Sequence, residues 1–355
     1  MAPNFTVKPA HMRSAAKEMR ENIAPAYKLG GENITNGGKI DSPGFGIALS
    51  MLFLPAYIQK LDFLSKDMSG AHDVVKEIAQ RLEAAATQYE KAENLNVSGF
   101  QGTPNSQASL SSAGGQALGS SGLLEVAGAG GAMIGTGVIQ AAFTAMGAAG
   151  ALSPAFIPAV IAAALAIPNI EDIHKAASNL SLTGASMGSK LNPAYEKAVT
   201  TATIGWEGEG RSAYITLNQT VKGHMDQIGK YVEALGGGLR TLEVALAGFW
   251  LAISAFIFPY LTWLIAMRIA QAFPLTAPAI EPIIAAASTA IASGVTTMIA
   301  GIIAVGGAVV TLVTALMKDA LDLTAIPDSG AEGTPDMTEF KVGLNFSVPS
   351  GNLVD

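Results

Sequence analysis

Hydrophobic residues recur in alternating steps of three and four along the first quarter of this chain. The first run begins near residue 9 and ends at Gly37–Gly38, where glycine is a common helix terminator. A longer run follows the turn around Pro43. Its apolar seam consists of Leu54, Ile58, Leu61, Ser65, Met68, His72, Val75, Ala79, Leu82, Ala86 and Tyr89. Heptad spacing is typical of helices that pack along one face, so residues 1–94 are predicted to form a helical hairpin.

The same plan returns after residue 170. Its two seams consist of Ile173, Ala177, Leu180, Gly184, Met187, Leu191, Ala194 and Ala198, then Tyr214, Leu217, Val221, His224, Ile228, Tyr231 and Leu235. The turn Trp206-Glu207-Gly208 joins them, and Gly44-Phe45-Gly46 in the first copy is interpreted as its degenerate counterpart. One hairpin cannot bury its own stripe, so the two are predicted to form an elongated four-helix bundle.

Three segments carry no charged residue: Val126–Ile170, Val244–Met267 and Ile283–Met317. Because about 20 apolar residues cross a bilayer, the first segment is long enough for two spans with a break between Ala148 and Pro154. The third is long enough for one long or two short spans. An Ala/Gly-rich core of a soluble bundle is the alternative, but helices of such a bundle normally show a polar face.

The predicted fold class is all-α: two helical hairpins that form an elongated helical bundle, plus Ala/Gly-rich hydrophobic helical hairpins. The Ser/Gly/Asn-rich stretch at 95–122 is typical of a flexible linker. One short strand is predicted in the polar tail, at 340–346. The predicted divisions are a first hairpin at 1–94, a linker at 95–122, a hydrophobic hairpin at 123–170, a second hairpin at 171–243, hydrophobic helices at 244–320 and a polar tail at 321–355.

Composition narrows the functional classes. Half of the residues are hydrophobic and 14% are charged, with a net charge of −7 and no basic run, so nucleic acid is excluded as a partner. There is no cysteine, and the four histidines never pair at ligand spacing, so no metal and no cofactor are predicted. No apolar segment follows the N-terminus, so a Sec-type signal peptide is not expected.

One catalytic pattern occurs, in Gly184-Ala185-Ser186-Met187-Gly188, which matches the nucleophile elbow of hydrolases. That elbow requires a preceding strand, whereas these residues lie in a helical seam. The only later histidine, His224, also lies on a seam. No enzymatic activity is predicted.

Two short motifs occur where predicted helices end. Tyr89 continues the second seam, and Glu93 follows one helical turn later, so both project from one face. Trp206 and Gly208 belong to the turn of the second hairpin. Each motif has an ordinary structural interpretation, as a core tyrosine with a solvated glutamate and as a glycine turn with an anchoring tryptophan. The alternative is a secretion signal formed by Tyr89, Glu93, Trp206 and Gly208.

Helical hairpins with a Trp-x-Gly turn and a Tyr-xxx-Asp/Glu end resemble the WXG superfamily, which type VII (ESX) systems export. A tyrosine signal on one hairpin and a Trp-x-Gly turn on the next resembles PE/PPE pairs and, more closely, EspB-like single-chain substrates. The resemblance covers residues 9–94 and 171–245; the opening motifs of PE and PPE proteins are absent. It implies antiparallel docking that brings the four signal residues to one bundle tip, and recognition by the secretion ATPase and a chaperone.

The sequence therefore predicts a non-enzymatic type VII secretion substrate or effector, secreted or held in the cell envelope. Its apolar hairpins are expected to be shielded before export and then to enter membrane lipid, as a homo-oligomer that forms a pore-like element or an anchored assembly. The alternative is a resident membrane protein that acts as a docking or scaffold component of a type VII system.

Overall fold

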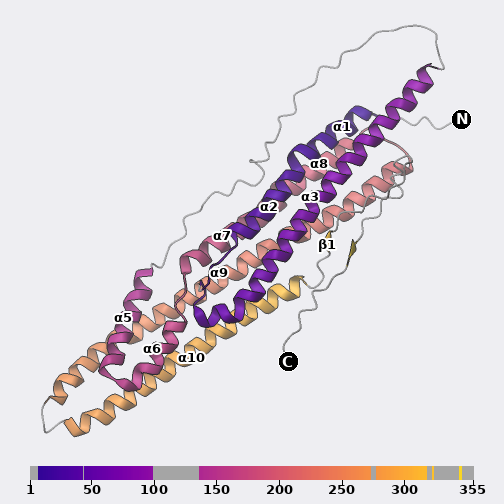
Figure 1. Cartoon of the computed structure of the whole chain (residues 1–355). Coiled ribbons are helices and arrows are strands. Elements are labelled where there is room, and N and C mark those ends of the chain that lie inside the picture. Colours follow the sequence, from indigo (N-terminus) through magenta and orange to yellow (C-terminus); the bar gives the residue numbers. More distant parts are fainter. Residues whose placement is uncertain are drawn as a thin grey trace.

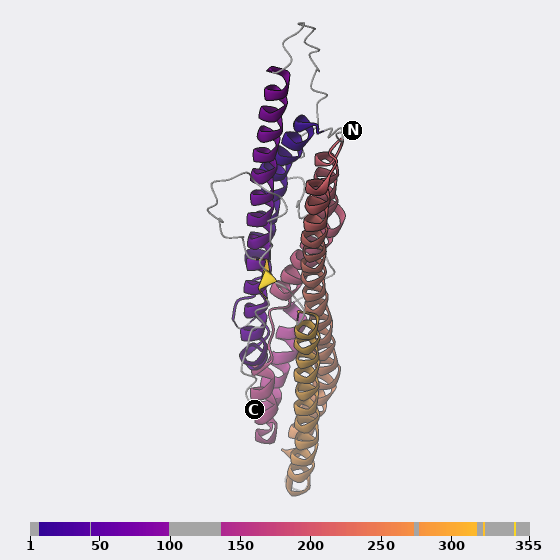
Figure 2. The same ribbon diagram turned by 90° about the vertical axis from the view of Figure 1, so that its right-hand side faces the viewer.

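The computed structural model describes residues 7–42, 44–98, 136–272 and 277–317, together with the short pairs 322–323 and 344–345. In these ranges the chain is almost entirely helical, and the helices lie along one long axis (Figure 1). Figure 2 shows the same elongated outline from a direction at right angles. Among the described residues, the strands β1 (Asp322–Leu323) and β2 (Leu344–Asn345) form one antiparallel pair. The predicted all-α class is confirmed.

The first hairpin packs a bent helical rod against one long helix. Its elements are α1 (Pro9–Glu18), a π-helical turn (Met19–Ile23), α2 (Ala24–Gly37) and α3 (Ile47–Ser98). The predicted stop is confirmed, because α2 ends at Gly37 and the Gly38 N–H donates to the Ile34 carbonyl at 3.0 Å. The final helix extends to Ser98, so the first residues of the predicted linker are helical; residues 99–122 lie outside the described ranges.

The second hairpin repeats this arrangement. Its elements are α7 (Ile170–Ser186), a π-helical turn (Met187–Leu191), α8 (Asn192–Ala202) and α9 (Glu209–Gln271). Asn169 caps α7 by accepting a hydrogen bond from the Asp172 N–H at 3.3 Å. The predicted seam is buried here: Leu180, Met187 and Leu191 are fully enclosed.

A repeat that the sequence analysis missed relates the two hairpins. Each π-helical turn begins with methionine and is followed by Pro-Ala-Tyr, at Pro25-Ala26-Tyr27 and Pro193-Ala194-Tyr195. Proline lacks the N–H for a helical hydrogen bond, and the wider turn before it accommodates that loss. Because α1 packs against α8 and α2 against α7, the two copies run antiparallel.

Buried polar groups join the two copies. The Tyr27 hydroxyl donates to Asn192 Oδ1 at 2.8 Å, and Asn192 Nδ2 donates to Asp226 Oδ1 at 2.7 Å. The Tyr195 hydroxyl donates to Asn218 Oδ1. Burial raises the pKa of Tyr27 and Tyr195, so both phenols stay protonated and remain donors.

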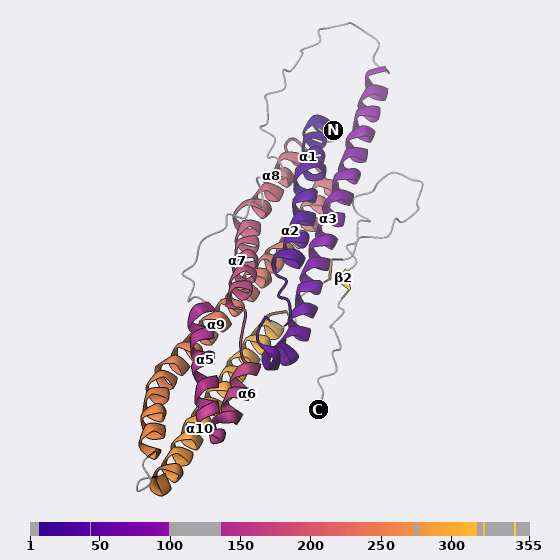
Figure 3. The same cartoon turned by 60° about the vertical axis from the view of Figure 1, so that its left-hand side comes forward.

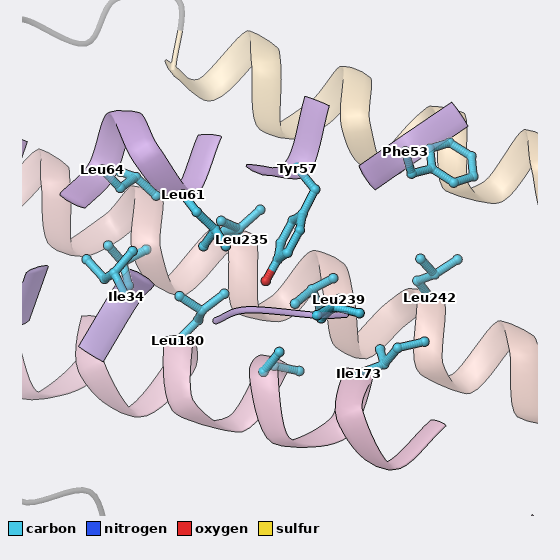
Figure 4. Packing of buried hydrophobic residues seen from close by; sticks show 14 of the residues in the cluster. Ile34, Phe53, Tyr57, Leu61, Leu64, Ile173, Leu180, Leu235, Leu239 and Leu242 are labelled. Carbon is cyan, nitrogen blue, oxygen red and sulfur yellow. The ribbon is translucent and has the colours of Figure 1, made fainter. Parts of the chain in front are cut away.

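The predicted seam of α3 is wrong at the start of that helix. Ile58 is 51% exposed, whereas Phe53 and Tyr57 are buried. The reason is tertiary: this end of α3 packs on α9 and α10 (Ala277–Met317) as well as on α2. Figure 4 shows the Tyr57 ring directed from α3 toward Leu239 of α9. A β-carbon on Gly306 of α10 would meet the Phe53 ring at 2.3 Å, so glycine permits the close approach of these helices.

The distal end of the rod consists of apolar helices. Figure 3 shows α5 (Thr136–Leu152) and α6 (Ile157–Leu165) beside the far ends of α9 and α10. The predicted break is confirmed, since α5 ends at Leu152 and a short 3₁₀ turn, Pro154–Phe156, follows. In the second half of this segment α6 has only 9 residues, so the expectation of two spans stays a prediction.

The predicted division into domains remains a prediction. The expected boundary between 243 and 244 falls inside α9, which continues as one helix of 63 residues from the polar half into the apolar half. The third apolar segment forms the single helix α10. In the predicted polar tail, β2 coincides with part of the expected strand at 340–346, and the other described residues are those of β1.

The buried polar link gives a test of the antiparallel pairing. The change Asn192→Ala removes the acceptor of the Tyr27 hydroxyl and the donor to Asp226. The buried Tyr27 hydroxyl and the half-buried Asp226 carboxylate then each lose that partner. We expect the free energy of unfolding to fall by about 1–3 kcal/mol, measured by urea denaturation. Gln219→Ala, at an exposed position of α9, serves as the control and should change stability by no more than about 0.5 kcal/mol. An equal effect of both changes would argue against this link.

Candidate functional site

The turn between α8 and α9 forms one end of the rod and contains Trp206. Its indole is 2% exposed, and its backbone N–H donates to the Thr203 carbonyl at 3.2 Å. Gly205 and Gly208 have positive φ angles of 71° and 103°, and Gly208 immediately precedes α9. These conformations favour glycine and give the turn its sharp reversal.

The corresponding turn of the first hairpin has the same design. Phe45 is 1% exposed, Gly46 has a φ of 84°, and α3 begins at the next residue. Each turn therefore joins a buried aromatic ring to a positive-φ glycine that precedes a long helix. This agrees with the interpretation of Gly44-Phe45-Gly46 as a degenerate counterpart of the Trp-x-Gly turn.

The tertiary structure brings the two sequence motifs into contact. The Tyr89 ring of α3 lies edge-on to Trp206, with ring centroids 6.5 Å apart and an interplanar angle of 70°. On its other side Trp206 packs against Tyr214 of α9, with centroids 5.4 Å apart. Aromatic pairs in this range are attractive beyond their buried area. The helices α3 and α9 and the turn before α9 thus meet at an aromatic cluster of Tyr89, Trp206 and Tyr214, called here the aromatic tip.

Exposure distinguishes the members of the aromatic tip. Trp206 and Tyr214 are buried, whereas Tyr89 is 37% exposed and the neighbouring Ile204 is 47% exposed. The sequence predicted that Tyr89 continues the buried seam of α3. In the structure Tyr89 lies at the edge of that seam. An approaching protein would meet Tyr89 and Ile204 first, over a buried tryptophan.

Glu93, the remaining member of the predicted signal, lies on the last turns of α3. These turns extend beyond the ends of α1 and α8 (Figure 1). The contacts of its side chain lie outside what the structure describes. One turn earlier, Glu90 pairs with Arg13 of α1 at 2.6 Å, which holds α3 against the first helix beside Tyr89.

Two polar atoms of the aromatic tip are buried and have no hydrogen-bond partner among the described residues. They are Trp206 Nε1 and the Tyr214 hydroxyl. Burial also raises the pKa of Tyr214, so its hydroxyl stays neutral. Leaving buried donors without acceptors is costly, so the packing of the rings has to offset that cost.

The tyrosine of the second copy is not an equivalent surface. Tyr195-Glu196-Lys197-Ala198 repeats the residues that start at Tyr89, but Tyr195 is only 1% exposed and bonds to Asn218. Its structural counterpart is Tyr27, in the Pro-Ala-Tyr repeat. Spacing from the methionines Met19 and Met187 is the sequence signal that identifies this pairing.

The apolar half has a different surface. Within the described residues, three helical stretches are long and apolar enough to cross a membrane: Pro154–Ala202, Gly210–Gln271 and Pro278–Val309. The first of these is interrupted between α6 and α7. Large side chains on the outside of α9 are exposed, among them Leu251, Phe256 and Ile265. Only 22% of the most apolar part of α10 is buried, so the bundle in this structure leaves most of that helix surface exposed.

Charged groups mark both ends of this apolar surface. Near the polar half, Glu243 contacts His174 at 3.0 Å and Arg240 at 3.1 Å. At the distal end, Arg268 pairs with Glu281 at 2.5 Å. Neither of these groups nor any other cluster of His, Asp or Glu in the described ranges could hold a metal ion.

Comparison with protein families gives a match over the N-terminal part of the chain. Residues 1–101 match the family described as "Excreted virulence factor EspC, type VII ESX diderm". The predicted resemblance to a type VII (ESX) secretion substrate is thereby confirmed for this part of the chain. The description is of an excreted virulence factor and names no enzymatic activity. Neither a curated protein nor a solved structure shows a significant match.

The Trp-x-Gly turn can be tested through Gly208. Its φ of 103° and ψ of −174° lie in a region that is essentially restricted to glycine. We expect Gly208→Ala to lower the free energy of unfolding by about 1–3 kcal/mol. Gly223→Ala is the matched control, because Gly223 lies within the same helix and a β-carbon there meets nothing within 4 Å. That change should stabilise the protein by roughly 0.5–1 kcal/mol, since alanine favours helix. Equal responses in thermal melts would contradict this account of the turn.

Proposed function

We propose that this protein is a non-enzymatic type VII secretion substrate whose export signal, formed by Tyr89, Glu93, Trp206 and Gly208, is centred on the aromatic tip. The single observation that carries the proposal is the contact between Tyr89 and Trp206, which come from separate hairpins. The family match of residues 1–101 supports it, because that family consists of excreted factors. The chain is then destined for secretion or for the cell envelope.

Folding is what assembles the proposed signal. Tyr89 and Glu93 belong to α3, whereas Trp206 and Gly208 belong to the turn before α9. An ATPase or a chaperone that reads all four residues would therefore select the docked bundle over either hairpin alone. Tyr89 and Ile204 are exposed apolar side chains, and Glu93 follows Tyr89 by one helical turn.

The apolar half supports a second step after export, which is insertion into membrane lipid. Its outward side chains on α9 are large and apolar, and they are bounded by charged groups at both ends. Exposure of such a surface is unfavourable in water, so lipid or further copies of the chain would cover it. We propose assembly as a homo-oligomer with a pore-like or anchored arrangement. The outward positions of α10 include the small residues Ala286, Ala290 and Gly294, which permit close helix packing.

Export is expected to depend on the aromatic tip. Tyr89→Ala and Trp206→Ala should each abolish recovery of the protein in culture filtrate while cellular levels persist, as measured by immunoblotting. Tyr89→Phe keeps the ring that contacts Trp206 and should be exported. Tyr27→Phe, which removes a hydroxyl away from the tip, is a control for general destabilisation.

Cell fractionation distinguishes the proposal from the resident scaffold. A scaffold would remain in the producing cell's membrane whether or not Tyr89 or Trp206 is replaced. Undiminished export of both alanine variants would refute the assignment of the signal. Loss of export in a strain that lacks the type VII ATPase would support the route.

Membrane insertion is expected to depend on the outward face of α9. The purified protein should float with phosphatidylcholine–phosphatidylglycerol vesicles and release an entrapped dye. Phe256→Glu combined with Ile265→Glu should reduce flotation about tenfold or more, since a carboxylate in the hydrocarbon core is costly. Thr220→Glu, at an exposed position of the polar half, should have no effect. Insertion is ruled out if the unaltered protein neither floats nor releases dye.

A further inference from the structure

The apolar part of α9 has the length of a membrane span. At about 1.5 Å per residue, the helix between Glu243 and Arg268 is roughly 37 Å long, which exceeds the hydrocarbon core of about 30 Å. Arg268 and Glu281 are the only charged residues between Val244 and Met317. Their pairing at 2.5 Å, together with the hydrogen bonds of Gln271 to both, reduces the cost of carrying them across a bilayer.

The α5–α6 hairpin reaches less far. Its turn lies beside Tyr260, because Ser153 Oγ lies 2.6 Å from Ser288 Oγ, and Ser288 Oγ lies 2.5 Å from the Tyr260 hydroxyl. Tyr260 lies about 25 Å along α9 from Glu243, so it is within the depth of a hydrocarbon core. The 9 residues of α6 then return toward the polar half, where Trp250 Nε1 donates to the Ala166 carbonyl at 3.3 Å.

Several polar groups of this turn have partners inside the protein. Ser153 and Phe156 are at most 2% exposed, whereas Pro154 between them is exposed. The Ser153 N–H donates to the Ala149 carbonyl at 2.8 Å, and the Phe156 N–H donates to the Ser153 carbonyl at 2.9 Å. From the distal end, Arg268 Nε donates to the carbonyl of Leu152, the last residue of α5, at 2.8 Å. Irregular backbone at membrane depth is tolerated only where protein buries it in this way.

We propose that in a bilayer α9 and α10 cross as one hairpin, whose Arg268–Glu281 end emerges on the far side, while α5 and α6 form a re-entrant hairpin. The α5–α6 turn stays inside the membrane, held by the hydroxyl cluster of Ser153, Tyr260 and Ser288. The α5–α6 unit enters and leaves on the side of the polar bundle. This topology rests on the membrane insertion proposed above.

The absence of cysteine makes the topology directly testable. Single-cysteine variants at three exposed positions report three levels: Thr220→Cys on the polar half, Ala151→Cys beside the α5–α6 turn, and Ala272→Cys at the distal end. Each is added to phosphatidylcholine–phosphatidylglycerol vesicles, and floated vesicles are treated with a membrane-impermeant maleimide coupled to a polymer too large to follow the path by which the entrapped dye is released. The reagent is supplied outside in one arm and trapped in the lumen in the other.

The re-entrant topology requires a different result at each level. Thr220→Cys should react only from outside, and Ala272→Cys should react about tenfold faster from the lumen than from outside, while Ala151→Cys should react from neither side. Labelling of Ala151→Cys from the lumen would overturn the re-entrant hairpin, and labelling of Ala272→Cys from outside would overturn the crossing. Both outcomes occur in vesicles that float, so they leave insertion intact. Absence of flotation would instead overturn insertion and the topology together.

Discussion

The continuity of α9 is the constraint on which the rest of the structure depends. One helix of 63 residues begins after Gly208, beside Trp206, and ends past Arg268 at the opposite end of the rod. A helix of this length cannot bury its apolar face alone, so its first half packs against the polar hairpins and its second half packs against α5 and α10. The aromatic tip and the apolar half are therefore two ends of one rigid element.

The antiparallel pairing of the two hairpins determines what lies at the tip. The helix α1 packs on α8, and α2 packs on α7. Asn192 links Tyr27 to Asp226 across this pairing. A buried amide between two partners specifies register, because a shifted alignment would leave each group unpaired. In this register the end of α3 lies beside the α8–α9 turn, and Tyr89 meets Trp206.

The apolar half combines two kinds of surface in one unit. Inside it, Ser153, Tyr260 and Ser288 satisfy one another among alanines and aromatic rings. Outside it, Leu251, Phe256 and Ile265 face away from the protein. The hydroxyl groups inside are hydrogen-bonded, and the outer face carries no charge. Such a unit is more stable in lipid than in water, which gives the proposed insertion a physical basis.

The sequence by itself determined the helical class, the stop at Gly37–Gly38, the break at Ser153 and the two turns with glycine, because these follow from local backbone preferences and from hydrophobic period. It also singled out Tyr89 and Trp206. Only the tertiary structure decided that their rings touch, that Tyr57 rather than Ile58 is buried, and that α6 is too short to cross a bilayer. These features depend on which helices become neighbours. Period along one helix identifies an apolar stripe, but the partner that covers each part of it is chosen by packing between residues far apart in the chain.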